Sequence, residues 1–243
     1  MRSPFELDDQ AIHLWAIPIE SSKSVVARLY ALLSGDEQLR AARFRYEDLQ
    51  RSFILARGVL RVLLGRYLDV RPNNVQFLYG PKGKPAVAEP EWLSFNTSHS
   101  DGMALFAITR ECEIGVDVER IRPLPDMYEI ARQFFCSEET SELMSLPIHQ
   151  RERAFYLCWT RKEAYIKASG NGLSMPLDSF QVTLDPTERA RFIHLDQDRD
   201  VANSWTLTNI KLTDPYVAAL AYREIERPLR LTCLTEATEL IDR

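Results

Sequence analysis

The sequence predicts an α+β fold of two similar halves that join near residue 114 and enclose a cleft. The first observation is a repeated order of long helix, short strand and strongly apolar strand. It occurs at residues 49–68, 75–79 and 103–109, and again at 151–168, 180–184 and 216–222. The second is length, because 243 residues with 45% hydrophobic side chains can bury a sizeable core. We expect an N-terminal half at residues 1–113 and a C-terminal half at 114–243.

Composition narrows the classes of partner. The net charge of −5 argues against general nucleic-acid binding, which needs a basic domain. No apolar run approaches the roughly 18 to 20 residues that span a bilayer, and the N-terminus MRSPFELDDQ lacks the pattern of a secretory signal. We therefore expect a cytoplasmic protein. The four cysteines form no CxxC pair, so we expect them to pack as small hydrophobes.

The first half begins with a strand at 12–17, followed by helices at 22–33, 36–44 and 47–68. Apolar residues at helical spacing predict one buried face on the long helix: Leu49, Phe53, Ala56, Leu60, Leu63 and Tyr67. Arginines crowd this region at positions 40, 43, 45, 51, 57, 61 and 66. Arg51 and Arg57 lie off the apolar stripe, where a charge is either solvated or faces an anionic ligand.

A strand at 75–79, the turn GPKGKP at 80–85 and strands at 93–100 and 103–109 complete this half. Lys84 lies on the turn, where it is either a solvated hairpin tip or a phosphate contact. His99 stands between Ser98 and Ser100. Imidazolium and hydroxyl groups all donate hydrogen bonds, so these side chains are candidate phosphate contacts. A structural histidine is an equally good interpretation.

The segment IGVDVE at 114–119 predicts a strand with two acids on one face. Side chains alternate along a strand, so Asp117 and Glu119 point one way while Val116 and Val118 point to the core. Adjacent carboxylates repel unless a cation or proton lies between them. Hard oxygen ligands favour Mg²⁺ or Ca²⁺, and few protein ligands beside a phosphate favour Mg²⁺. The alternative is an edge strand with solvated acids.

The remaining chain predicts a helix at 127–135, a second helix capped by Ser137 and closed by Pro147, and a helix within 155–173. Gly170 and Gly172 end the last of these. Glu163 and Lys167 have the spacing of a surface ion pair. Strands follow at 180–184 and 216–222, with a loop-rich segment at 185–203 between them and a terminal helix at 235–242.

Several separate motifs agree with one family. They are Arg51 with RGVLR (57–61), GKP (83–85), FNTSHS (95–100), GVDVE (115–119) and WTRKEAYIK (159–167). They cover roughly residues 40 to 175 in the family's order, and ordered motifs are stronger than any single match. By these motifs the chain resembles a 4′-phosphopantetheinyl transferase of the surfactin-synthetase-activating (Sfp) type. GVDVE followed by WxxKEAxxK is the specific pair.

The resemblance implies transfer of 4′-phosphopantetheine from coenzyme A to a serine of an apo carrier protein, with release of adenosine 3′,5′-bisphosphate. The donor would bind between pseudo-symmetric halves, its nucleotide on the N-terminal side, with carriers docking on the C-terminal half near residues 127–146. Asp117, Glu119 and Glu163 would ligate Mg²⁺, and Lys167 would contact the pyrophosphate. Ser98 and His99 would hold phosphate oxygens, with Arg51 at the 3′-phosphate and Lys84 on the nucleotide side. Asp117, Glu163 and Lys167 would be the catalytic residues.

Some points stay open at this level. Glu163 is a metal ligand, a base or both, and Arg40, Arg43 and Arg57 are uncertain further phosphate contacts. One alternative is another Mg²⁺-dependent nucleotide transferase, although no Walker-type GxxxxGK[ST] loop occurs. The other is a non-catalytic module that binds coenzyme A or carrier proteins. Because one chain contains both halves, we expect a monomer. From the charge and hydropathy given above, we expect it to contact neither nucleic acid nor membrane.

Overall fold

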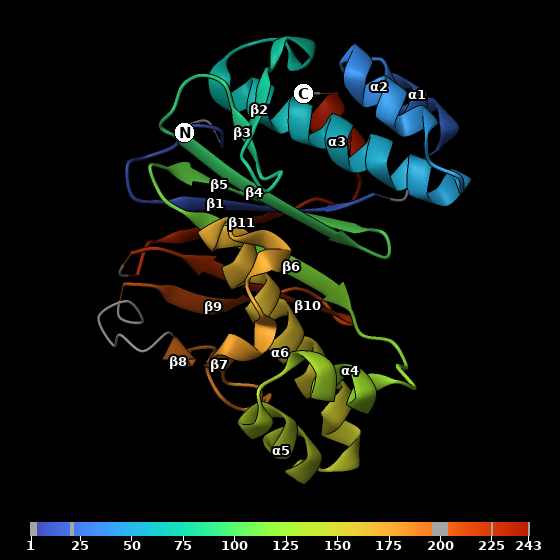
Figure 1. Cartoon of the computed structure of the whole chain (residues 1–243). Coiled ribbons are helices and arrows are strands. Elements are labelled where there is room, and N and C mark those ends of the chain that lie inside the picture. The colour runs from blue at the N-terminus through green and yellow to red at the C-terminus, as the bar shows by residue number, and fades with distance from the viewer. Residues whose placement is uncertain (1–3, 20–21, 196–203, 225, 243) are drawn as a thin grey trace.

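The computed structural model describes residues 4–19, 22–195, 204–224 and 226–242. Two sheets pack face to face, and helices cover their outer faces (Figure 1). The first sheet has the order β11–β1–β5–β4 and the second β6–β10–β9. Their strands are β1 (Ile12–Pro18), β4 (Leu93–Ser100), β5 (Met103–Arg110), β6 (Ile114–Arg120), β9 (Thr206–Ile210), β10 (Tyr216–Tyr222) and β11 (Leu229–Cys233). Two short hairpins are β2 (Phe77–Tyr79) with β3 (Pro85–Val87), and β7 (Phe180–Val182) with β8 (Phe192–Leu195).

Each sheet carries one long helix of 22 residues, α3 (Glu47–Leu68) or α6 (Ile148–Ser169). Leu55 and Leu63 of α3 share a buried cluster with Phe106 of β5. On the other sheet, Ala164 of α6 shares a cluster with Ala219 of β10. The predicted α+β class with a long helix in each half is therefore confirmed. The shorter helices are α1 (Lys23–Tyr30), α2 (Gly35–Ala42), α4 (Met127–Phe134), α5 (Ser137–Ser145) and α8 (Thr238–Ile241).

A third apolar cluster lies between the two sheets. Leu14 of β1 and Leu105 of β5 meet Val116 and Val118 of β6 there. Trp15, the next residue of β1, belongs instead to the cluster under α3. Strand β1 is thus buried on both faces, which explains why IHLWAI is continuously apolar rather than alternating.

The C-terminal segment returns to the first sheet. β11 pairs in parallel with β1, with Ile12 opposite Leu229. Leu234, Ala237 and Leu240 then complete the core beneath α3. The boundary between residues 113 and 114 stays a prediction, and residues 229–241 pack with the half that precedes it.

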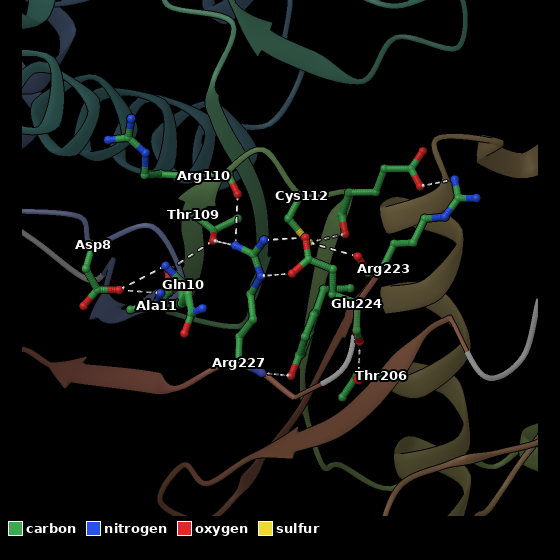
Figure 2. Close-up of polar contacts among 12 residues, drawn as sticks. Asp8, Gln10, Ala11, Thr109, Arg110, Cys112, Thr206, Arg223, Glu224 and Arg227 are labelled. Atoms are coloured by element: carbon green, nitrogen blue, oxygen red, sulfur yellow. Dashed lines mark hydrogen bonds and ion pairs between the residues drawn. The ribbon is translucent and has the colours of Figure 1, made fainter.

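Arg227 ties the two halves together at one end of the sheets (Figure 2). Its guanidinium donates to the hydroxyl of Thr109 at 3.1 Å and to the carbonyl of Arg110 at 3.0 Å, both at the end of β5. Nε donates to a carboxylate oxygen of Glu224 at 2.7 Å. This guanidinium is almost fully buried. Loss of its contacts with β5, or of its contact with Glu224, would therefore leave buried N–H donors without acceptors.

Four details of the sequence prediction were wrong. Leu49 is 53% exposed, because the core under α3 begins only at Ile54 and the first turns of the helix have little to cover. Cys136, not Ser137, is the N-cap of α5, and it forms a capping box with Glu139. The long helix expected at 151–168 begins three residues earlier, at Ile148, and ends at Ser169. Strands β9 and β11 were not predicted, and β8 lies inside the expected loop 185–203, whose residues 196–203 are outside the described part.

Candidate active site

Three elements meet where the edge of β4 approaches β6 and α6 crosses the second sheet. Strand β4 supplies Ser98 and Ser100, and β6 supplies Asp117 and Glu119. The first acid faces α6 because its neighbours Val116 and Val118 occupy the inter-sheet core, as the alternation predicted.

Gly115 sets the distance between α6 and β6. A Cβ built on it would lie 2.1 Å from the carbonyl oxygen of Ala164 and 2.3 Å from the nitrogen of Ala168. Only glycine permits so close an approach of helix and strand backbones. Glu163 and Lys167 directly precede these two alanines, so the contact also brings the functional side chains of α6 to the acids of β6.

Asp117 is the centre of the site and is 3% exposed. Its Oδ1 accepts hydrogen bonds from Lys167 Nζ at 2.6 Å and from Ser98 Oγ at 2.8 Å. Within the described residues, its Oδ2 is buried without a hydrogen-bond partner. A buried carboxylate oxygen without a partner costs free energy, so this atom marks a place where a cation or a donor belongs.

The negative charge of Asp117 acts on the carboxyl groups of both Glu119 and Glu163. Burial raises the pKa of Glu163, and the charge of Asp117 raises it further while Lys167 opposes the rise. Burial likewise raises the pKa of Glu119, whose Oε2 accepts a hydrogen bond from Ser100 Oγ at 2.7 Å. The three acids therefore form one electrostatic group with Lys167 as its counter-charge. The surface ion pair considered for Glu163 and Lys167 is wrong, since Lys167 pairs with Asp117.

Lys84 crosses from the first half to the second. Its ammonium donates to the carbonyl of Ile114 at 3.1 Å and to that of Ala168 at 2.9 Å. It thus caps the end of α6 and the start of β6 together. Burial lowers the pKa of Lys84 to about 8, opposed by the charge of Glu113. The solvated hairpin tip is therefore wrong for this lysine.

A cavity of about 280 Å³ opens beside these groups, lined by Lys84, Asn96, Thr97, Glu163, Ile166 and Lys167, among others. Arg51 lines a different hollow of about 600 Å³ together with Asp101 and Arg120. A larger hollow, about 870 Å³ near Arg28 and Arg66, is lined by none of the predicted site residues. Chemistry rather than size therefore identifies the site.

The other basic candidates have internal partners. Arg57 donates to Tyr79 Oη at 2.6 Å, pairs with Glu37 and lies over the ring of Phe77. Arg40 lies over the ring of Phe53. His99 lies on the face of β4 opposite Ser98, where desolvation and the charge of Lys167 lower the pKa of its ring. At neutral pH its ring is thus a weaker anion contact than Lys167.

The donor set fits a hard divalent cation. Among the described residues, no group of three or more His, Cys, Asp and Glu side chains already stands in metal-binding geometry. The unpartnered Oδ2 of Asp117 and the raised pKa values of two neighbouring carboxyls nevertheless show what a cation would relieve. Oxygen ligands that are few and open on one side suit Mg²⁺, which keeps waters and phosphate oxygens in its shell.

Sequence reasoning did not assign a role to Gly115 or Asn96, and it considered Ser100 only as a candidate phosphate contact. Asn96 Oδ1 accepts the backbone N–H of Val116 at 3.0 Å, so it joins the two strands. The signal was present in the sequence: β4 has polar residues at 94, 96, 98 and 100, and β6 has acids at 117 and 119.

Comparisons with known proteins match most of the chain. A profile of the 4′-phosphopantetheinyl transferase superfamily matches residues 113–221, and one described as "4′-phosphopantetheinyl transferase, N-terminal" matches residues 19–111. The 4′-phosphopantetheinyl transferase HetI of Nostoc sp. is 39% identical over 86% of each chain. A putative 4′-phosphopantetheinyl transferase of Synechocystis sp. is 36% identical, also over 86% of each.

More distant matches carry less weight. The 4′-phosphopantetheinyl transferase Sfp of Bacillus subtilis is 31% identical over 65% of this chain and 69% of its own. The holo-[acyl-carrier-protein] synthase of Thermotoga maritima aligns with 47% of this chain and 64% of its own at 20% identity. The TM-score of this alignment is 0.37.

Proposed function

Because the chain belongs to the 4′-phosphopantetheinyl transferase superfamily, we propose that it moves 4′-phosphopantetheine from coenzyme A to a serine of an apo carrier protein. Adenosine 3′,5′-bisphosphate is the second product. The observation that carries the assignment is Asp117, buried with one oxygen left without a partner among the described residues. Its other oxygen binds Ser98 and Lys167, and Lys167 lines a cavity together with Glu163.

The residues divide the chemistry among them. Asp117, Glu119 and Glu163 would hold Mg²⁺, which when bound would supply positive charge to the pyrophosphate group of the donor. The carrier serine oxygen bonds to the phosphorus next to pantetheine, and the bond from that phosphorus to the bridging oxygen breaks. The serine proton passes to the carboxylate of Glu163, which lines the cavity beside Lys167. Lys167 stabilises the charge that develops on the departing bisphosphate.

The nucleotide lies on the side of the first half. Arg51 meets the 3′-phosphate, and its neighbour across the hollow, Arg120, adds a second positive charge. His99 contacts a phosphate oxygen, while the hydroxyl of Ser98 is already engaged by Asp117 and Lys167. Lys84 reaches the nucleotide only by giving up one of its two carbonyl partners. Its contribution to the affinity for coenzyme A is therefore the free energy of the new contact minus that of the lost hydrogen bond.

The carrier protein docks beside α4 and α5. Met144 at the end of α5 is 40% exposed, and Ile148 at the start of α6 is 81% exposed. An apolar pair of this kind suits the centre of a small transient interface. Arg132 is exposed on α4 and adds a positive charge for acidic carriers. Binding should therefore weaken as salt is raised.

The enzyme acts as a monomer in the cytoplasm. All four cysteines are free in the structure, as suits a reducing compartment. None of the helices in the described part of the chain has the length and apolar character needed to cross a membrane.

Incubation with coenzyme A, Mg²⁺ and an apo carrier protein tests the proposal. The carrier should gain about 340 Da, the mass of the transferred group expected for this phosphoryl transfer. No gain with any carrier would overturn it. Turnover of nucleoside triphosphates with indifference to coenzyme A would indicate a different Mg²⁺-dependent nucleotide transferase. Binding of coenzyme A without transfer would indicate a binding module.

A further inference from the structure

Strands β4 and β6 are joined through side chains along one edge. Asn96, Ser98 and Ser100 accept the backbone N–H groups of Val116, Val118 and Arg120, at 3.0, 3.3 and 3.3 Å. Each of these β4 residues bonds to the β6 residue 20 positions later. The offset is constant because side chains on one face of a strand recur every two residues in both strands. We call these three contacts the β4–β6 seam. The strands belong to different halves, so the seam connects the halves beside the active site.

The two serines of the seam also bind the two acids of β6. Ser98 Oγ donates to Asp117 Oδ1 at 2.8 Å, and Ser100 Oγ donates to Glu119 Oε2 at 2.7 Å. Each hydroxyl thus accepts the N–H of one β6 residue and donates to the carboxylate of the residue before it. Asn96 meets the same strand opposite Gly115, where there is no side chain to bind.

The hydrogen-bonding capacity of Ser98 is used up by these contacts. A hydroxyl has one donor and two acceptor lone pairs. The donor goes to Asp117, and the lone pairs receive the N–H of Val118 and Nζ of Lys167 at 3.1 Å. No donor remains for a phosphate oxygen. The expected phosphate contact therefore requires breaking the bond to the central carboxylate.

We propose that Ser98 and Ser100 are positioning residues that hold Asp117 and Glu119 in the orientation in which they bind the divalent cation. This inference rests on the proposed function. A hydrogen bond to one oxygen of each carboxylate fixes its rotation and leaves the other oxygen, such as Oδ2 of Asp117, directed elsewhere. Residues that orient ligands in this way are worth about 10- to 100-fold in metal affinity or activity.

The orientation is imposed across the boundary between the halves. Strand β6 carries the acids, whereas the hydroxyls that orient them come from β4 of the first half. A cation therefore binds best when the three hydrogen bonds of the β4–β6 seam are formed. Its affinity should depend on contacts that lie outside its own ligand shell.

Three variants separate positioning from other roles. Ser98→Ala removes the hydroxyl, and Ser98→Thr keeps it. Ser94→Ala is the matched control, since Ser94 lies on the same face of β4 four residues earlier and makes no hydrogen bond through its side chain within the described structure. For each variant we would measure Mn²⁺ affinity by electron paramagnetic resonance with coenzyme A present, KM for coenzyme A at saturating Mg²⁺, and Tm.

Positioning predicts that Ser98→Ala weakens Mn²⁺ binding by about tenfold or more while KM for coenzyme A changes less than about twofold. Ser98→Thr should recover most of the affinity, and Ser94→Ala should match the wild type. A raised KM with unchanged Mn²⁺ affinity would overturn the inference in favour of a phosphate contact. A lowered Tm with unchanged Mn²⁺ affinity would overturn it in favour of a purely structural role.

The same measurements separate this inference from the proposed function. If the wild type binds Mn²⁺ but transfers nothing to any carrier, the proposed function fails and the Mn²⁺ affinities of the variants still decide the role of Ser98. If the wild type transfers phosphopantetheine but binds no Mn²⁺, the proposed function stands and the positioning role is overturned.

Discussion

Replacing Gly115 by alanine should separate the catalytic helix from the metal-binding strand. The added Cβ would lie 2.1 Å from the carbonyl oxygen of Ala164, where ordinary contact begins at 3.4 Å. The helix must therefore withdraw by about 1.3 Å, the difference between these distances, because backbone atoms on both sides prevent a local escape. Glu163 and Lys167 move with it.

The expected loss follows from that displacement. A misplacement of about 1 Å at an active site costs about 10²-fold in rate, and overpacking costs about 1–3 kcal/mol of stability. We expect Gly115→Ala to fold, with a lowered Tm and kcat/KM reduced by about 100-fold. The assay is the rate of mass gain of a carrier protein, with circular dichroism as the check on folding.

Gly35→Ala is the matched control. Gly35 is the first residue of α2, and an added Cβ there meets nothing within 4 Å. Alanine also has the higher helix propensity, so stability should be unchanged or slightly raised. A Gly115→Ala enzyme with kcat/KM within about threefold of the wild type would refute the idea that this contact sets the spacing of the site.

Four further predictions concern single side chains. Asp117→Ala and Glu163→Gln should each abolish transfer, and near-wild-type turnover would remove that residue from the site. Folding raises the pKa of Glu163, so its ionisation at pH 7 lowers the stability of the folded protein. Glu163→Gln should therefore raise Tm at pH 7, and the difference in Tm from the wild type should vanish below pH 4.5. A lowered Tm at pH 7 would contradict this. Arg51→Ala should raise KM about tenfold for coenzyme A but not for 3′-dephospho-coenzyme A, and equal effects would refute the 3′-phosphate contact. Ile148→Glu should raise KM for the carrier about tenfold, whereas Ile193→Glu, at another exposed isoleucine (44%, on β8), should not; equal effects would argue against docking beside α5.

The parts of the fold that the sequence predicted depend on local patterns. Alternation along 114–119 correctly separated Asp117 from the core valines, and helix periodicity gave the correct bounds for 47–68. The same periodicity failed at Leu49, because burial depends on where the neighbouring sheet ends.

The remaining parts depend on contacts between distant segments. The pairing of Ile12 with Leu229 joins residues more than 200 positions apart, and no local pattern specifies it. The partners of Ser98, Lys84 and Arg57 were likewise not predictable. Each hydrogen bond or ion pair joins elements whose approach is set by packing of the two sheets and their helices.

The return of β11 to the first sheet bears on how the chain folds as it is synthesised. The ribosome releases the N-terminal half first, yet β1 then lacks its β11 neighbour, and the core under α3 lacks Leu234, Ala237 and Leu240. Until the last residues emerge, β1 presents an unpaired edge that other nascent chains can extend. The first half to be made is thus the last to be completed, and a chain truncated before residue 229 should aggregate rather than yield a working N-terminal half.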